Sequence, residues 1–321
     1  MQLKLGLALW ADSVLPALLP FFIATELLSY TNVIPFLGRM LNKFMRPIFN
    51  VPGEGAFPFI MGIISGYPVG AKIVTKLREN NTCTKEEAER LLAFTNNSGP
   101  LFIVGTVGIS LIGDTTIGIT LLIVHILASI TVGVLFRFWK SNKVLNRNYK
   151  FSYNYLPCSR NESNTNVSFS NLGEVMGKSI MNSINTVVMI GGFVVLFSVI
   201  ISILENSDTL HILSVLIYPI LDLLHIPHEY ATGLLSGIIE LTNGLNTIST
   251  IPIKEYSYTI LLSSFLLGFG GISVLLQVFS IISKTDISIK SYLIGKILHA
   301  IISAIYFFIF FNFFIVFSLN L

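Results

Sequence analysis

Amides, hydroxyls and charged side chains interrupt this otherwise apolar chain at four places. The stretches are SGYPVGAK (Ser65–Lys72), TNNSGP (Thr95–Pro100), ELTNG (Glu240–Gly244) and GFGGISVLLQ (Gly268–Gln277). Each contains glycine or proline, which break a helix. Without water, an interrupted helix is stable only where protein or a wet cavity satisfies its freed backbone groups. The four stretches therefore predict residues that line a binding or permeation site inside a membrane protein.

The side chains at these breaks suit a polar solute. A broken helix exposes amides at one end and carbonyls at the other, and these bind anionic and cationic groups respectively. Asparagine and glutamine supply both donors and acceptors, which fits a hydroxyl-rich or heterocyclic solute. The predicted solute-binding residues are Ser65, Tyr67, Lys72, Asn96, Asn97, Ser98, Glu240, Thr242, Asn243 and Gln277. The predicted helix breaks are Gly66, Pro68, Gly70, Gly99, Pro100, Gly244, Gly268, Gly270 and Gly271.

Glu240 and Lys72 are the two charged residues among these candidates. A charge at mid-membrane costs about 2.5–3.5 kcal/mol on insertion scales, so it usually has a partner or a task. Glu240 can bind a cation or carry a proton, and Lys72 can neutralise Glu240 or hold an anion. Alternatively, Lys72 extends toward the neighbouring polar segment 75–90 and has no further role.

Other polar residues have equally ordinary explanations. Small residues such as those of Gly268–Gly271 let membrane helices approach closely, whether or not a site is present. His125 and His299 are isolated in the sequence, and a lone intramembrane histidine is more often a packing residue than a ligand. Cys83 and Cys158 lie in polar segments without CxxC spacing, which predicts reduced thiols on the cytoplasmic side.

Several functional classes find no support in the sequence. There is no HExxH, GxSxG, Walker loop or CxxC motif, so we expect no enzyme, no cofactor and no metal site. No basic stripe with interleaved aromatic residues is present, so we expect no nucleic-acid partner.

The composition predicts an all-α polytopic membrane protein. Hydrophobic residues make up 53% of the 321 residues and charged residues 12%, against about 25% charged in soluble domains. Several apolar runs are long enough to cross a hydrocarbon core of about 30 Å. They are continuous rather than alternating, which disfavours a β-barrel. The first expected partner is therefore the lipid bilayer.

The apolar runs occur in the same order in the two halves of the chain. Each half reads as a span, an amphipathic helix, two broken helices and a second span. The ranges are 3–28, 33–49, 56–74, 91–113 and 116–138, then 180–204, 210–225, 230–250, 258–283 and 292–317. Matching landmarks lie 172 to 175 residues apart, as in Val51 and Ile226 or Ser98 and Gly270. Such duplication predicts two repeats with discontinuous helices that meet near the bilayer midplane, and a site at their interface.

Three regions follow from this order: a first membrane repeat (1–138), a basic linker rich in Asn and Ser (139–178) and a second membrane repeat (179–321). The positive-inside rule places the linker in the cytoplasm. If 33–49 and 210–225 cross the membrane, the repeats are inverted; if both lie in its interface, the repeats are parallel. The inverted arrangement obeys the charge rule better, although the cationic face of 33–49 favours an interfacial helix.

The motifs together resemble one family. SGYPVGAK and TNNSGPLFIVGTVG, with LWADSVLPALLPFFIATELL (9–28), RPIFNVPG (46–53), ELTNG and LLGFGGISVLLQ, closely resemble the YlbJ-type sporulation integral membrane proteins. The resemblance implies a membrane protein of an endospore-forming bacterium that is needed for spore maturation, particularly cortex formation. It also implies repeats similar to the nucleoside-recognition or Gate domain of concentrative nucleoside transporters. It supplies no binding residues.

The leading hypothesis is a permease-like transporter or gate for an unidentified small polar solute, coupled to a cation or a proton. One alternative is a non-transporting scaffold for cortex-assembly proteins, with other sporulation membrane proteins as partners. Another is a nucleoside-type ligand sensor. We expect a multi-pass protein of the bacterial cell membrane, in the sporangium or forespore. The sequence leaves open the solute, the direction of transport, the driving ion and the oligomeric state.

Overall fold

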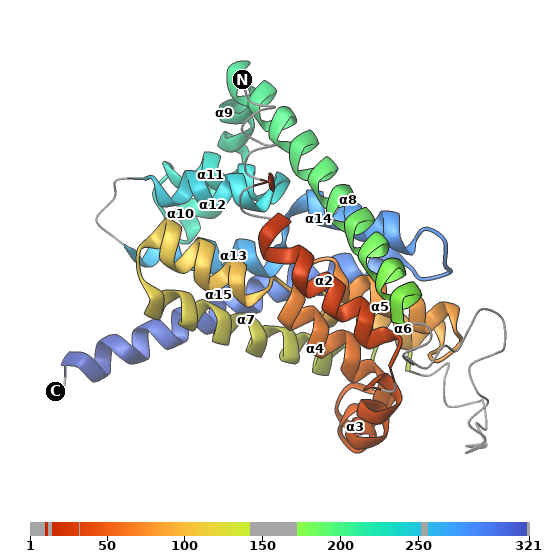
Figure 1. Cartoon of the computed structure of the whole chain (residues 1–321). Coiled ribbons are helices and arrows are strands. Elements are labelled where there is room, and N and C mark those ends of the chain that lie inside the picture. The colour runs from red at the N-terminus through yellow and green to blue at the C-terminus, as the bar shows by residue number, and fades with distance from the viewer. Residues whose placement is uncertain (1–9, 12–14, 32, 142–171, 252–255, 320–321) are drawn as a thin grey trace.

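The computed structural model describes residues 10–11, 15–31, 33–141, 172–251 and 256–319, and these residues form helices and short connections without a strand. Figure 1 shows the order of the elements along the chain. The first series consists of α2 (Leu15–Ser29), α3 (Val33–Phe49), η2 (Gly53–Gly55), α4 (Ala56–Ser65), α5 (Val69–Glu79), α6 (Lys85–Thr95), η3 (Leu101–Ile112) and α7 (Thr115–Phe136).

The second series repeats this order. It consists of α8 (Leu172–Asn206), α9 (Thr209–Ser214), η5 (Val215–Ile217), α10 (Tyr218–Leu223), α11 (Tyr230–Ile239), α12 (Leu241–Ser249), α13 (Tyr256–Phe269), α14 (Gly271–Ile282) and α15 (Ile289–Leu319). Helix α8 begins at Leu172 rather than at 180, so the end of the predicted linker is helical. Residues 142–171 and Cys158 within them lie outside the described residues.

The helices are those of a multi-pass membrane protein. Four described segments are long and apolar enough to cross a membrane: Thr115–Phe136, Leu172–Asn206, Ser257–Ile282 and Ile289–Phe310. A fifth candidate is the pair Phe36–Phe49 and Gly53–Ser65, which is bent by 90° at its break. A mean hydropathy of +0.75 for the chain agrees with this.

Packing between the two series is reciprocal. Helix α6 packs on α15 while its counterpart α13 packs on α7, and α5 packs on α14 while α12 packs on η3. The equivalent helices α2 and α8 lie side by side and run in opposite directions (Figure 1). Exchange of the same contacts is what a two-fold relation produces. Antiparallel equivalent helices are what inverted repeats require.

The amphipathic character predicted for α3 is present along its whole length. Phe36, Met40 and Phe44 are exposed along one stripe, and the side chains of Arg39 and Lys43 are exposed beside it. An exposed apolar stripe next to cations is typical of a helix at a membrane interface. Neither α3 nor the segment α9–α10 is long enough to span the bilayer alone. A membrane crossing by either one stays a prediction.

The element boundaries correct three of the predicted breaks. Gly70 lies inside α5, Gly244 inside α12 and Gly268 inside α13. A Cβ atom at these positions would lie 2.1 Å from Thr95 O, 2.1 Å from Gly237 Cα and 2.7 Å from Ala300 Cα respectively. Their absent side chains allow helices to pack closely, so these glycines are packing residues.

The remaining breaks are where the sequence predicts them. Helices α4 and α5 are separated at Gly66–Pro68, α6 and η3 at Asn96–Pro100, and α13 and α14 at Gly270. The break between α11 and α12 lies at Glu240, one turn before the predicted Gly244. Helix α6 begins with a capping box, in which Thr84 and Glu87 are bonded reciprocally.

Candidate functional site

The four helix breaks meet at one place inside the protein. A Cβ on Gly66 would lie 2.9 Å from the Gly99 nitrogen, and a Cβ on Gly270 would lie 2.9 Å from the Tyr67 hydroxyl. A Cβ on Gly271 would lie 3.2 Å from the backbone nitrogen of Leu241. Gly66, Gly270 and Gly271 also adopt positive φ angles, which glycine tolerates best. The predicted convergence of broken helices from both repeats is therefore present in the structure.

Two buried asparagines hold the break between α6 and η3. Asn96 donates from Nδ2 to the Tyr292 hydroxyl at 2.9 Å, and its Oδ1 accepts the Ala71 N–H at 3.4 Å. Asn97 donates from Nδ2 to the Phe94 carbonyl at 2.9 Å and to Ser129 Oγ at 3.2 Å. Asn96 thus joins the first break to the second repeat.

Lys296 on α15 is the basic residue at this junction, and it was not among the residues predicted from sequence. It is 1% exposed. Its Nζ donates to the Tyr67 hydroxyl at 3.2 Å, to the Asn96 carbonyl at 3.3 Å and to His299 Nδ1 at 3.4 Å. These three acceptors match the three hydrogens of an ammonium group. No ion pair joins Lys296 to a carboxylate in the described part of the chain.

Tyr67 ties the first break to the end of α13. Its hydroxyl donates to the Leu267 carbonyl at 3.0 Å and therefore accepts the hydrogen bond from Lys296. The Lys296 Nζ also lies 5.0 Å from the centroid of the Tyr67 ring, within the range of a cation–π contact. Tyr67 therefore partly compensates the buried cation.

His125 and His299 form a pair, contrary to the expectation that each is isolated. Their ring centroids are 4.4 Å apart, and both residues are buried where α7 crosses α15. The two lie 174 residues apart, the spacing of the other repeat landmarks, and each begins an HxxxS sequence that ends at Ser129 or Ser303. These two matching HxxxS sequences are the sequence signal that identifies the pair, because equivalent positions on the crossing helices meet at the two-fold axis.

Four buried polar atoms at or beside the break between α6 and η3 have no hydrogen-bond partner: Thr95 Oγ1, Asn97 Oδ1, Ser98 Oγ and His125 Nδ1. Buried polar groups are normally paired with protein or water, so an unpaired group needs an explanation. Acceptors and a nitrogen from neighbouring segments could together contact a polar solute or ordered water.

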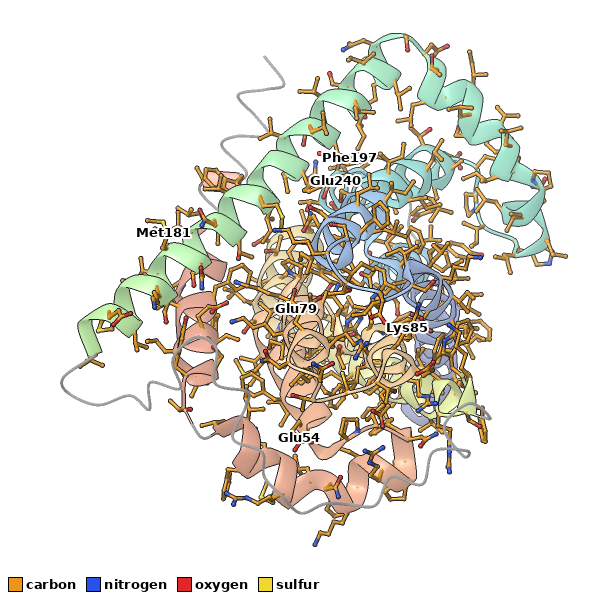
Figure 2. The ribbon with its side chains drawn as sticks, turned by 90° about the vertical axis from the view of Figure 1, so that its right-hand side faces the viewer. Glu54, Glu79, Lys85, Met181, Phe197 and Glu240 are labelled. Carbon is orange, nitrogen blue, oxygen red and sulfur yellow. The ribbon has the colours of Figure 1, made fainter. Side chains whose placement is uncertain are left out.

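Glu240 begins α12 at the adjoining break. It is 3% exposed, and its Oε2 accepts the Asn243 N–H at 2.9 Å as a helix cap. Asn243 donates from Nδ2 to Ser198 Oγ on α8 at 3.3 Å. Figure 2 labels Glu240, and Phe197 on α8. No lysine or arginine of the described residues forms an ion pair with Glu240.

The idea that Lys72 neutralises Glu240 is wrong. Lys72 Nζ lies 2.5 Å from Glu26 Oε1 on α2 and 3.0 Å from Thr186 Oγ1 on α8. Lys76 pairs with the other oxygen of Glu26 at 3.1 Å. Lys72 points to α2 and α8 because it lies one turn beyond the break, so it links these two helices instead of lining the junction.

The other predicted site residues do not all lie at the junction of the four breaks. Ser65 bonds to Thr25 of α2 through the two hydroxyl oxygens, which are 3.0 Å apart. Ser98 lies at the junction and donates its backbone N–H to His125 Nε2 at 3.2 Å. Gln277 is buried on α14, which packs on α5 and α8, and Thr242 is partly buried in the first turn of α12.

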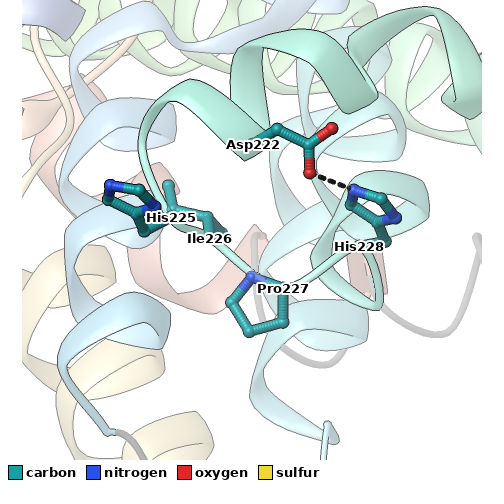
Figure 3. Close-up of a pocket in the computed structure, with 5 residues that line it drawn as sticks. All are labelled: Asp222, His225, Ile226, Pro227 and His228. Atoms are coloured by element: carbon teal, nitrogen blue, oxygen red, sulfur yellow. Dashed lines mark hydrogen bonds and ion pairs between the residues drawn. The ribbon is translucent and has the colours of Figure 1, made fainter.

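A separate pocket lies at the surface between α10 and α11. It is lined by Asp222, His225, Ile226, Pro227 and His228, and His228 Nε2 lies 2.6 Å from Asp222 Oδ1 (Figure 3). None of these residues belongs to the four breaks. No group of three His, Cys, Asp or Glu side chains able to hold a metal occurs among the described residues.

Comparison with known proteins identifies similar sequences. The family model described as Gate, nucleoside recognition, matches residues 11–136 and 187–319. The chain is similar to the sporulation integral membrane protein YlbJ of Bacillus subtilis, with 38% identity over 94% of this chain and 75% of that protein. It is also 28% identical to an uncharacterized protein of Alkalihalophilus pseudofirmus over 40% of this chain and 24% of that protein. No solved structure matches.

Proposed function

Because the chain belongs to the Gate family, described as nucleoside recognition, and is a relative of the sporulation protein YlbJ, we propose that it is a permease-like sporulation protein. It moves or gates a small polar solute across the membrane in which it lies. In the cell, the protein contributes to formation of the spore cortex.

The observation that carries this proposal is the meeting of four broken helices around a buried polar network at the interface of two repeats. Intramembrane polar residues are costly and usually serve binding or transport. In transporters built from repeats, discontinuous helices supply the solute site, and rocking of one repeat against the other exposes it alternately. The reciprocal packing of the two series supports this mechanism.

Lys296 indicates the class of solute. When the Lys296 amine is protonated, no carboxylate balances its buried charge, and only the Tyr67 ring and neutral acceptors contact it. A bound negative group would stabilise that charge strongly in a medium of low dielectric constant. We therefore expect a small polar solute that carries a negative group, with His125 Nδ1 and the asparagine amides of the break between α6 and η3 orienting it.

The test is flux in proteoliposomes that contain the full-length protein. The solutes are nucleosides, amino sugars, dipicolinate and metal ions, each measured with and without protein. We expect protein-dependent flux of dipicolinate, the anionic member of the panel, and at least a tenfold loss of that flux in Lys296→Gln and in Asn97→Ala. Lys290→Gln is the matched control, because Lys290 is an exposed residue of the same helix.

Two results contradict the proposal. Absence of protein-dependent flux for the whole panel removes the transport function, and equal flux in Lys296→Gln and Lys290→Gln removes the site. Glu240→Gln separates the two polar regions, because an effect confined to this variant moves the site to the break at α12.

The family description favours one second candidate, a sensor that binds a nucleoside-type ligand without moving it. Ligand binding by the purified protein together with no flux would support the sensor. A scaffold for cortex-assembly proteins differs from both, since its function would depend on residues 137–178 and not on Asn97 or Lys296. Replacing that linker with a Gly/Ser chain and scoring cortex formation distinguishes the scaffold.

A further inference from the structure

The hydrogen bonds around His125 and His299 determine which nitrogen of each ring carries hydrogen. The Ser98 amide can only donate, so His125 Nε2 accepts and the neutral ring carries its hydrogen on Nδ1. The His125 carbonyl can only accept, so His299 Nε2, 3.0 Å away, donates to it. His299 Nδ1 is then free to accept from Lys296. The two histidines are therefore neutral and are opposite tautomers in this arrangement.

A proton added to either ring removes one of these contacts. On His125 it must bind at Nε2, where it displaces the Ser98 amide, which belongs to the break between α6 and η3. On His299 it must bind at Nδ1, where it displaces the Lys296 ammonium. The hydrogen-bond arrangement in the structure and a protonated pair thus exclude each other.

The charges around the pair also oppose a proton in this arrangement. Lys296 is the charged group beside the rings, and Tyr67 and Tyr292 join the same network. On the packed elements, η3 and α14 contain no titratable residue and α13 contains only Tyr256 and Tyr258. Among the charged residues of α3 and α6, Arg46 bonds to Glu87, Glu89 to Lys140, and Arg90 to the Trp139 and Asn50 carbonyls. Arg39 and Lys43 of α3 are exposed at the surface.

We propose that the His125–His299 pair is the binding site of a coupling proton, and that its protonation opens the junction of the four helix breaks. By linkage, a state that binds the proton better becomes more populated as protons are supplied. A negative group bound beside Lys296 would reduce the repulsion of the proton, so solute and proton would bind cooperatively. That last step rests on the proposed function, whereas proton binding and opening do not.

The position of the pair supports a coupling role over simple packing. The rings lie on the axis that relates the two repeats, at the crossing of α7 and α15, so a change there acts on both repeats equally. His125 Nδ1 is a buried donor without a partner in this arrangement. A pair of neutral packing residues would gain nothing from that unpaired group.

The experiment measures hydrogen exchange of the segment 94–104 in the full-length protein in lipid nanodiscs, between pH 5 and pH 7.5. Rates are corrected for the intrinsic effect of pH on amide exchange. We expect protection of this segment to fall at least tenfold toward pH 5 in the wild type. In His125→Gln/His299→Gln the dependence should disappear, since the glutamine carbonyl can still accept from Ser98 but does not titrate.

His228→Gln is the matched control. His228 is a surface histidine paired with Asp222, and its replacement should leave the pH dependence of the segment 94–104 unchanged. Lys296→Met should move the midpoint upward by about one pH unit or more, because a neighbouring like charge is removed. Each variant must be monodisperse and must show the wild-type rate of hydrogen exchange in α8.

Protection that does not change with pH in the wild type overturns the proposal, and so does an unchanged pH dependence in the double variant. Histidine ¹⁵N chemical shifts give an independent measurement, since His125 and His299 must appear as opposite tautomers at pH 7.5. Two identical tautomers also overturn it. Neither measurement needs a solute, so failure of the flux assay and failure of this proposal are distinguishable.

Discussion

At the scale of single residues, the lysines inside this protein differ in whether a carboxylate balances their charge. Lys72 and Lys76 share Glu26 as a partner, whereas Lys296 has only neutral acceptors. A buried cation with its hydrogen bonds satisfied but its charge uncompensated is where a negative solute gains most. This difference, more than the presence of a lysine, separates the candidate site from a structural ion pair.

Cys83 gives a prediction at the same scale. The residue is 3% exposed, and burial together with nearby Glu87 raises the pKa of its thiol to about 12. A raised pKa lowers the fraction of reactive thiolate at neutral pH. We expect maleimide to label Cys83 at least tenfold more slowly than a free thiol at pH 7.5 in the native protein. Labelling should become rapid in detergent with denaturant.

The measurement is a time course of mass increase in Cys158→Ser, which leaves Cys83 as the single thiol. Fast labelling of the native protein would show that the segment 80–84 opens readily. Because Cys83 is buried, we expect slow labelling from both sides of the membrane, which carries no information on topology.

At the scale of elements, the broken helices approach one another through glycine. Gly70 on α5 lies against the Thr95 carbonyl that ends α6, and Gly62 on α4 lies against the same carbonyl. These contacts bring the first two breaks together. The Asn96 and Asn97 side chains then satisfy the groups that the breaks leave free.

Gly70→Ala tests this close approach. An added Cβ would lie 2.1 Å from Thr95 O, so α5 and α6 must move apart. Overpacking of this kind typically costs about 1–3 kcal/mol. We expect a lower midpoint for loss of the monodisperse peak in heated fluorescence size-exclusion chromatography. Gly192→Ala is the control, because no atom lies within 4 Å of a Cβ at that position of α8. Equal midpoints for the two variants would contradict the close packing.

At the scale of the whole molecule, positive charge gathers at one end. No lysine or arginine occurs in residues 101–136 or 179–251, whereas basic residues occur in α3, at the end of α5 and the start of α6, directly after α7, and around the start of α15. Contacts join these segments: Arg78 bonds to Asp286 at 2.9 Å and Glu89 to Lys140 at 2.6 Å. The positive-inside rule places this end in the cytoplasm.

Single cysteines on opposite ends test this orientation. Glu79 at the end of α5 and Glu205 near the end of α8 are both exposed. In a Cys83→Ser/Cys158→Ser background, we expect an impermeant maleimide to label Glu205→Cys from outside intact cells. Glu79→Cys should react only after the membrane is permeabilised. Labelling of both from the same side would contradict the inverted arrangement of the repeats.

Much of the fold was predictable because its signals are local or periodic. The apolar runs, the bounds of α3, the capping box at Thr84 and the breaks at Gly66–Pro68 and Gly270 all depend on a few adjacent residues. The duplication was predictable because the order of elements recurs. Gly70, Gly244 and Gly268 were misassigned as breaks, because close packing and chain interruption both favour glycine.

The composition of the candidate site was decided by the tertiary structure. Sequence determined that broken helices in two repeats would bring polar residues into the membrane, because such interruptions are tolerated only inside protein. Which charges pair, however, depends on contacts between distant helices: Lys72 was directed to Glu26, and Lys296 to Tyr67 and Asn96. His125 and His299 became a pair because α7 and α15 cross at the axis between the repeats, a relation that no single stretch of sequence contains.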